Sequence, residues 1–217
     1  MKLSERTLLT LKNFANINAG VVFRPGKTQK TWSFDKSILV ETELDDDFPC
    51  LFGVYDLNQF LGNLTTLNSP ELTFNEDHVI LDDGMMKINY KSCDPELISS
   101  PPNKSLSIDD PSVKFVLTNV VFSKISKLAV MNRLQNISVV GQTGVLKIKA
   151  HDIKNDKSNE IITDIGDWIG EDFICTFHAE NLKILPDDYT VSIKKNVFSE
   201  FRSTSRNLTY FITLLAV

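Results

Sequence analysis

Three histidines and three cysteines are the residues in this sequence that could act as nucleophiles or bind a transition metal. His78, His151 and His178 lie far from one another and from the cysteines, so none has the spacing of a zinc site or a Cys-His nucleophile. We therefore interpret each as an ordinary surface or core histidine. The cysteines are odd in number and widely separated, which argues against a disulfide framework and suits a reducing cytosol.

Two groups of aspartates have the composition of a cation site but lack its spacing. Neither residues 45–47 nor residues 82–84 continue into the alternating oxygen ligands and closing Glu of a calcium loop. We interpret both as solvated turns. The sequence also has no glycine-rich phosphate loop, no GxSxG elbow and no dinucleotide fingerprint. We therefore expect no catalytic residues, no metal and no cofactor.

Lysine and arginine gather in two segments of a chain whose net charge is −5. Residues 1–30 carry six bases and one acid, and residues 113–135 carry four bases and no acid, whereas residues 31–112 carry 16 acids and four bases. Such segments can neutralise nucleic-acid phosphates without reading the base sequence. Aromatic residues are not interleaved with the bases, which favours duplex over single-stranded DNA. The alternative is a chance clustering of surface lysines.

Helices are predicted to position both basic segments. Residues 4–16 place apolar side chains on one helical face, with polar residues opposite. The candidate DNA-binding residues on or beside this helix are Lys2, Arg6, Lys12 and Asn13. A second helix is predicted over residues 123–135, where Lys124 and Lys127 share a side and Arg133 points elsewhere.

Two pairs of short stretches suggest that one structural unit occurs twice. Residues 14–18 echo residues 134–138 at an offset of 120, and residues 58–61 echo residues 181–185 at an offset of 123. The intervening segment is rich in proline and polar residues, as extended linkers are. The predicted organisation is an N-terminal domain over residues 1–91, a linker over residues 92–111 and a C-terminal domain over residues 112–217.

Each predicted domain combines two helices with short antiparallel strands, which is an α+β class. The second helices of the two domains are predicted over residues 55–64 and 179–185. The predicted strands of the first domain are residues 17–23, 31–34, 38–44, 72–74, 79–81 and 86–90. Those of the second are residues 114–117, 137–140, 145–150, 173–177, 190–194, 198–201 and 208–215.

Four stretches carry a likeness to a known family. They are residues 1–4 (MKLS), 11–20 (LKNFANINAG), 55–62 (YDLNQFLG) and 102–104 (PNK). These stretches resemble the sliding clamp, or DNA polymerase processivity factor, of T-even-type bacteriophages. The resemblance implies two similar clamp domains per subunit, each with two helices on curved antiparallel sheets. It also implies that three subunits close a ring around duplex DNA, with Lys12 and Arg133 at positions of basic pore residues.

The same resemblance implies protein partners. They are an ATP-driven clamp loader, a C-terminal tail of the replicative polymerase and, in addition, phage late-transcription factors. Extended tails are usually held in apolar grooves. The candidate partner-binding residues are Leu106, Ile108, Leu214, Leu215 and Val217. The chain ends without the polar, acidic extension that the family pattern leads us to expect.

The expected location is the cytoplasm of an infected bacterial host, because the sequence has neither a secretory leader nor a membrane span. A hypothesis of another class is a non-enzymatic β-rich structural or assembly protein without a DNA partner. An enzyme of unrecognised type is disfavoured by the lack of catalytic motifs.

Overall fold

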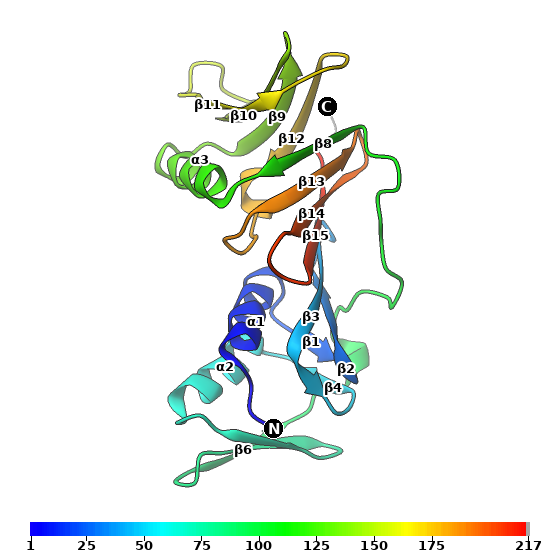
Figure 1. Ribbon diagram of the computed structural model, residues 1–217. Coiled ribbons are helices and arrows are strands. Elements are labelled where there is room, and N and C mark those ends of the chain that lie inside the picture. Colours follow the sequence, from blue (N-terminus) through cyan, green and yellow to red (C-terminus); the bar gives the residue numbers. More distant parts are fainter. Residues whose placement is uncertain (216–217) are drawn as a thin grey trace. The chain divides into compact units, whose positions relative to one another are not determined.

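The computed structural model describes residues 1–215, and the chain divides into two compact units, Met1–Ser105 and Leu106–Val217, here unit 1 and unit 2 (Figure 1). Each unit combines helix with antiparallel strands, which confirms the predicted α+β class. No helix in the described part of the chain is long and apolar enough to cross a bilayer.

Unit 1 contains two α-helices, seven strands and one short 3-10 turn. In chain order they are α1 (Glu5–Ile17), β1 (Val21–Phe23), β2 (Gly26–Trp32), β3 (Ile38–Phe48), β4 (Phe52–Val54), α2 (Leu57–Thr66), β5 (Glu71–Phe74), β6 (His78–Asp82), β7 (Lys87–Lys91) and η1 (Pro95–Leu97). The strands form the pairs β1–β4 and β2–β3 and a sheet of order β5-β6-β7. The α1 and α2 helices pack against each other, and α1 also packs on β3.

Aromatic rings fill the core of unit 1. Phe23 and Phe48 stack with their ring centres 4.2 Å apart, and Phe60 of α2 lies 6.3 Å from Phe23. All three side chains are buried, so α2 is fixed to the strands by the face that carries Phe60. The opposite face of the helix is left to solvent.

Unit 2 contains one α-helix, eight strands and a second 3-10 turn. In chain order they are β8 (Val113–Leu117), α3 (Asn119–Met131), β9 (Asn136–Gln142), β10 (Val145–His151), β11 (Ile161–Asp167), β12 (Phe173–His178), η2 (Ala179–Asn181), β13 (Tyr189–Lys194), β14 (Phe198–Ser203) and β15 (Leu208–Thr213). The sheet orders are β11-β10-β9-β12 and β8-β13-β14-β15. The α3 helix packs against β10 and β11.

The predicted helix over residues 179–185 is wrong, because only the short turn η2 forms there. The backbone of Leu185 is bound to tyrosine side chains instead of to a helical turn. Its N–H donates to the Tyr210 hydroxyl at 3.1 Å, and its carbonyl accepts from the Tyr189 hydroxyl at 2.6 Å. Both tyrosines are fully buried, and burial raises the pKa of each phenol far above its ordinary value.

Other differences concern boundaries and two unpredicted strands. The α3 helix begins at Asn119 and ends at Met131, so the predicted span of residues 123–135 is displaced by four residues. The strands β4 and β11 were not expected, because β4 has only three residues and the apolar residues of β11 are interrupted by Asp164, Gly166 and Asp167. The aspartates of residues 45–47 lie within β3 and do not form a turn.

A buried polar chain crosses the β10-β9-β12 part of unit 2. The Ser138 hydroxyl lies 2.7 Å from His151 Nε2 and 2.8 Å from the Thr176 hydroxyl, and all three side chains are buried. Burial, aided by the nearby Lys149 ammonium, holds the pKa of His151 below its ordinary value of 6.5. A protonated imidazole at this place would be a poorly solvated charge.

We predict that the free energy of unfolding falls as the pH drops below about 6.5. The unfolded chain binds a proton at His151 in that range, whereas the folded chain resists it, so this stability is complete above pH 6.5 and is lost below it. Urea unfolding between pH 8 and 5.5 should show the decline. His151→Gln should flatten it, and His178→Gln, at an exposed histidine of the same unit, should leave it unchanged.

Candidate nucleic-acid interface

The α1 helix and the residues directly before it expose three of the predicted cations to solvent. Lys2, Arg6 and Lys12 are exposed, while Leu11, Phe14 and Ile17 bury the opposite face. Ser4 caps the helix, because its hydroxyl accepts a hydrogen bond of 3.1 Å from the Thr7 N–H. The cations therefore stand on or directly before a helix whose start and orientation are both fixed.

Asn13 does not belong to this exposed surface. Its side chain is only 6% exposed and lies on the buried side of α1. The prediction that Asn13 contacts DNA is therefore wrong. One residue corresponds to 100° around a helix, so Asn13 points toward the core while Lys12 points to solvent.

Acids of β3 hold the N-terminal end of α1. The Asp46 carboxylate accepts a hydrogen bond of 2.7 Å from the Ser4 N–H, and Asp45 lies 3.8 Å from the Arg6 guanidinium. A carboxylate is favourable at this end of a helix, where backbone N–H groups point outward. The interpretation of these aspartates as solvated turns is therefore wrong, and their role is to position α1.

The α3 helix is positioned in a similar way. Its first N–H, from Asn119, donates to the Asp188 carboxylate at 2.7 Å, and Thr118 is the N-cap, whose hydroxyl accepts from the Val121 N–H at 3.4 Å. Phe122, Ile125 and Ala129 bury one face. The exposed residues of the other face are Val120, Lys124, Lys127, Leu128, Val130 and Met131. The two predicted lysines thus share their surface with apolar side chains.

Arg133 lies just beyond α3 in a left-handed backbone conformation, with a φ of 56°. Two hydrogen bonds close the helix around it: Leu134 N–H donates to the Ala129 carbonyl at 2.9 Å, and Arg133 N–H donates to the Val130 carbonyl at 3.1 Å. This is the Schellman ending, in which glycine usually occupies the left-handed position. An arginine there carries conformational strain and presents an exposed guanidinium at the helix end.

A hollow of about 610 Å³ lies between the C-terminal half of α3 and residues 178–182. It is open because η2 has replaced a full helix, whereas in unit 1 the α2 helix packs directly on α1. The floor is apolar, with Ala129, Leu134 and Ile137. The rim is polar and is formed by Arg133, Gln135, His178 and Glu180.

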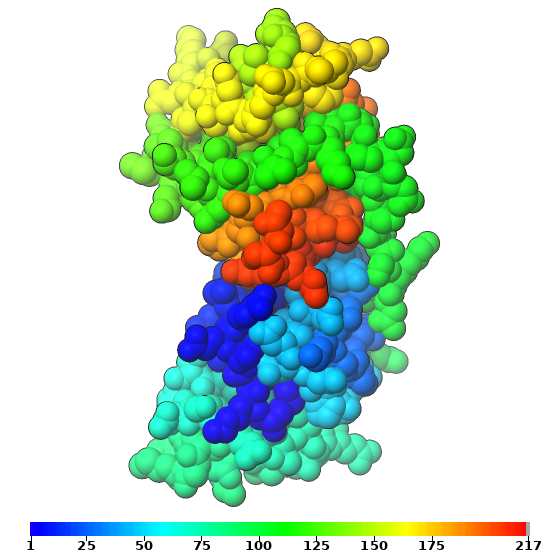
Figure 2. All heavy atoms as spheres, viewed as in Figure 1, coloured from blue at the N-terminus to red at the C-terminus, as the bar shows by residue number. Residues whose placement is uncertain are grey.

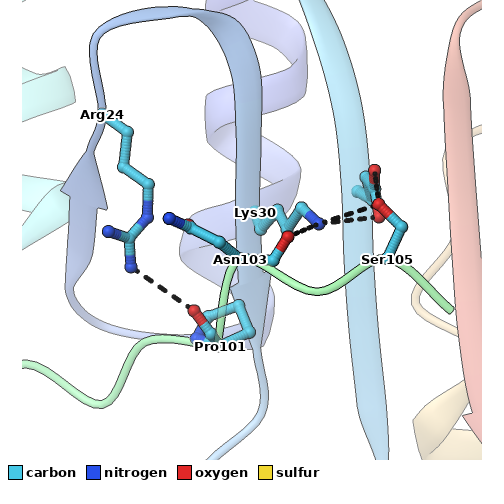
Figure 3. Close-up of polar contacts among 6 residues, drawn as sticks. Arg24, Lys30, Pro101, Asn103 and Ser105 are labelled. Atoms are coloured by element: carbon cyan, nitrogen blue, oxygen red, sulfur yellow. Dashed lines mark hydrogen bonds and ion pairs between the residues drawn. The ribbon is translucent and has the colours of Figure 1, made fainter.

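Two of the three remaining cations of the N-terminal basic segment, Arg24 and Lys30, contact the linker. Arg24 Nη2 lies 3.4 Å from the Pro101 carbonyl oxygen, and Lys30 donates to the Asn103 carbonyl at 3.4 Å (Figure 3). The Lys30 ammonium also pairs with Glu41 at 3.0 Å, and the side chain is only 9% exposed. Lys30 therefore makes contacts within unit 1, although it belongs to the same basic segment of the sequence as Lys12.

The predicted apolar partner residues that the structure describes lie outside the strands of unit 2, in the segment before β8 and directly after β15. Leu106 is 42% exposed, and Ile108 is tied to β14 by its N–H, which donates to Glu200 at 3.3 Å. Leu215 is tied to β12 through the Thr176 carbonyl, and Leu214 beside it is partly buried. Val217 lies outside the described residues. A docking pocket formed by these side chains stays a prediction.

Metal chemistry has no evident ligand set in the region covered by residues 1–215, where no three His, Cys, Asp or Glu side chains are grouped to hold an ion.

Comparison with known sequences places these surfaces in a family context. A family model described as DNA polymerase processivity factor matches residues 2–99. The sliding clamp of Vibrio phage KVP40 is 30% identical over 223 residues, an alignment that covers 100% of both chains. The sliding clamp of Enterobacteria phage T4 is 27% identical over 198 residues, covering 87% of this chain and 85% of that protein. These matches confirm the resemblance to phage clamps.

Solved structures show the same fold at low sequence identity. The proliferating cell nuclear antigen (PCNA) of Entamoeba histolytica aligns with a TM-score of 0.69 and 14% identity, covering 99% of this chain and 98% of that one. The A. fulgidus PCNA, solved with the C-terminal region of FEN-1, aligns with a TM-score of 0.71 and 13% identity, covering 97% and 95%. The H. pylori β clamp aligns with a TM-score of 0.73 and 12% identity, covering 100% of this chain and 65% of the clamp.

We predict that Arg133→Gly leaves the free energy of unfolding unchanged or raises it by up to about 1 kcal/mol. Glycine relieves the left-handed strain, although it also makes the unfolded chain more flexible. Arg133→Ala is the matched control, since it removes the same guanidinium but keeps a Cβ in the strained position. Urea unfolding of the three proteins measures the difference. A glycine variant less stable than the alanine variant would contradict the assignment of strain.

Proposed function

The chain belongs to the family of phage sliding clamps, the processivity factors of DNA polymerases, and we propose that three copies close into a ring around duplex DNA. Such a ring tethers the polymerase by topology, because a closed ring cannot leave a duplex sideways. It catalyses no reaction. Weak contacts with the phosphates then suffice, and they allow the ring to slide.

The observation that carries the DNA contact is the set of exposed cations on α1 and at α3. Lys12 stands on the solvent face of α1, Lys124 and Lys127 on that of α3, and Arg133 at the end of α3. Lys2 and Arg6 extend the set at the start of α1. These side chains offer charge without base-reading geometry, as sequence-independent binding requires. The surrounding acidic chain would repel phosphates elsewhere and so direct the duplex toward these helices.

The outer edges of β7 and β11, two of several outermost strands in the sheets, support the closure of the ring. In the described part of the chain β7 pairs only with β6, and β11 pairs only with β10, so each leaves one row of backbone groups for another partner. The charges of the two strands are complementary, and the β7 lysines also pair with Asp82 and Asp77 of their own unit, at 2.9 Å each. The β7 strand carries Lys87 and Lys91, and β11 carries Asp164 and Asp167. We propose that β7 of one subunit pairs with β11 of the next.

Helical surfaces supply a second layer for this junction. On either side of the stripe that carries Lys124 and Lys127, the α3 helix exposes Leu128 and Val130, with exposed fractions of 41% and 79%. Beside β7, a shallow groove of about 370 Å³ runs between that strand and α2, lined by Gln59, Asn63 and Tyr90 among others. We propose that α3 of the neighbouring subunit covers this groove when β11 joins β7. Apolar side chains at the centre of an interface are the usual source of its stability.

Protein partners follow from the same function. The A. fulgidus relative was solved with the C-terminal region of FEN-1, which supports our proposal that a C-terminal tail of the polymerase docks on this clamp. We further propose that an ATP-driven loader opens the ring and that phage late-transcription factors share the docking surface. A clamp for a phage polymerase would work in the cytoplasm of the infected bacterium.

The decisive experiment is polymerase extension on primed circular DNA with a cognate loader and ATP. The protein should make synthesis processive on the intact circle. Linear DNA with free ends should abolish the effect, because the ring then slides off. An equal effect on both substrates would contradict topological tethering.

Charge reversal tests the DNA surface. The triple variant Lys12→Glu, Lys124→Glu, Arg133→Glu should shorten clamp-dependent products while the ring still assembles, because repelled phosphates weaken each contact. The control triple is Lys27→Glu, Lys154→Glu, Lys157→Glu, which changes charge equally at exposed residues outside the proposed surface. Product length and the mass of the assembly are measured. Equal product lengths for both triples would contradict the pore assignment.

A charge swap tests the junction. At low micromolar concentration the wild-type mass should be that of three subunits, 24.5 kDa each. Asp164→Lys with Asp167→Lys should shift the assembly toward monomer, since the proposed junction would then bring four lysines close together. Adding Lys87→Asp and Lys91→Asp in the same chain should restore the trimer by reversing both edges. Failure of the second pair to restore it would argue against β7 facing β11.

A further inference from the structure

Three exposed apolar side chains lie beside the outer edges of β7 and β11. Ile169, which follows β11, is 97% exposed, and Met85 and Met86, which precede β7, are 86% and 58% exposed. Single exposed apolar residues are common on protein surfaces, but each of these lies at the end of a strand that lacks a neighbour on one side, the methionines in unit 1 and Ile169 in unit 2.

The loop that carries Ile169 is held in one shape. The Trp168 backbone N–H donates to the Gly144 carbonyl at 2.9 Å, and its indole N–H donates to the Glu171 carbonyl at 3.0 Å. The Trp168 ring also packs edge-on against Phe173, with ring centres 4.7 Å apart. Ile169 is therefore presented outward by a fixed loop, which projects from the surface at the upper right of Figure 2 (yellow).

The turn that carries the two methionines is fixed as well. The Asp83 carboxylate accepts hydrogen bonds from the N–H groups of Met85 and Met86, at 2.9 and 2.8 Å. The Asp83 carboxylate thus fixes the backbone of the turn, while the two methionine side chains are exposed to solvent. Methionine is flexible and polarisable, so a pair of them adapts to the shape of an apolar partner.

Antiparallel pairing brings these two loops together. In such a pair the start of β7 lies beside the end of β11. If Lys87 is opposite Asp167, then Met85, two residues before Lys87, is opposite Ile169, two residues after Asp167. Residues two apart lie on the same side of a strand, so the ion pair and the apolar pair share one face.

We propose that Ile169 of one subunit packs against Met85 and Met86 of the next and forms an apolar clasp at one end of the junction. This inference rests on the proposed ring. The partner is a second copy of the chain, because the clasp and the complementary charges beside it, on Lys87 and Asp167, lie in the same sequence. The acids Glu171 and Asp172 follow Ile169 closely in the chain, and their negative charge disfavours DNA as the partner of Ile169.

The first test is Ile169→Asp, with Ile153→Asp as the matched control at a half-exposed isoleucine of the same unit. We expect Ile169→Asp to raise the dissociation constant of ring assembly roughly ten- to hundredfold, as the loss of one buried aliphatic side chain predicts. The control should stay close to wild type. Native mass spectrometry across a dilution series measures both, and circular dichroism checks that each variant is folded.

The second test needs no destabilising charge. A chain carrying Met85→Cys and Ile169→Cys should form disulfide-linked species of two and three chains under a mild oxidant. Each single-cysteine variant is a control for reactions of Cys50, Cys93 and Cys175.

The outcomes separate the clasp from the ring. Weakened assembly of Ile169→Asp, together with the specific crosslink, supports the clasp. A trimer that is indifferent to Ile169→Asp and gives no crosslink overturns the clasp but leaves the proposed ring intact. A wild-type protein that stays monomeric at all concentrations overturns both.

Discussion

Unsatisfied backbone hydrogen bonding at sheet edges is the constraint on which the rest of this structure depends. A strand has two rows of N–H and C=O groups, and β7 and β11 each use only one of them within the described chain. Such edges are sites of uncontrolled association unless they are covered. In the ring that we propose, β7 of one subunit and β11 of the next would cover each other, and the closed ring would also retain a duplex. Closure of the ring would therefore pair the free strand edges and retain the DNA at the same time.

Acidic and basic side chains have different roles in the two units. The carboxylates of Asp46 and Asp188 each meet the N-terminal end of a helix, where they satisfy N–H groups and oppose the positive end of the helix dipole. The exposed bases lie farther along the same helices. This arrangement explains how a chain of net charge −5 can present cationic helices. The acids orient the helices, and the lysines they orient are free to meet phosphate.

The α+β class, the order of most elements and the exposure of Lys12 could be predicted, because apolar periodicity and turn residues are local signals. The burial of Asn13 could not, since it depends on how wide a face of α1 packs on the unit. The missing second helix of unit 2 depends on Tyr189 and Tyr210, which bind the Leu185 backbone from later strands. Asp46 reaches Ser4 across 42 residues, a contact that no local pattern encodes. These three features therefore depend on tertiary packing, which a local sequence pattern does not encode.

The contact between Trp32 and the linker gives unit 1 an intrinsic fluorescence signal. The indole N–H of Trp32 donates to the Ser99 hydroxyl at 2.8 Å, and the Lys36 ammonium lies 4.8 Å from the centre of the ring. Indole emission responds to both a hydrogen bond and a nearby charge. The only other tryptophan, Trp168, lies in unit 2, where phenylalanine could replace it to silence the background. Lifting of the linker by any ligand would then be readable as a change of fluorescence, without an attached dye.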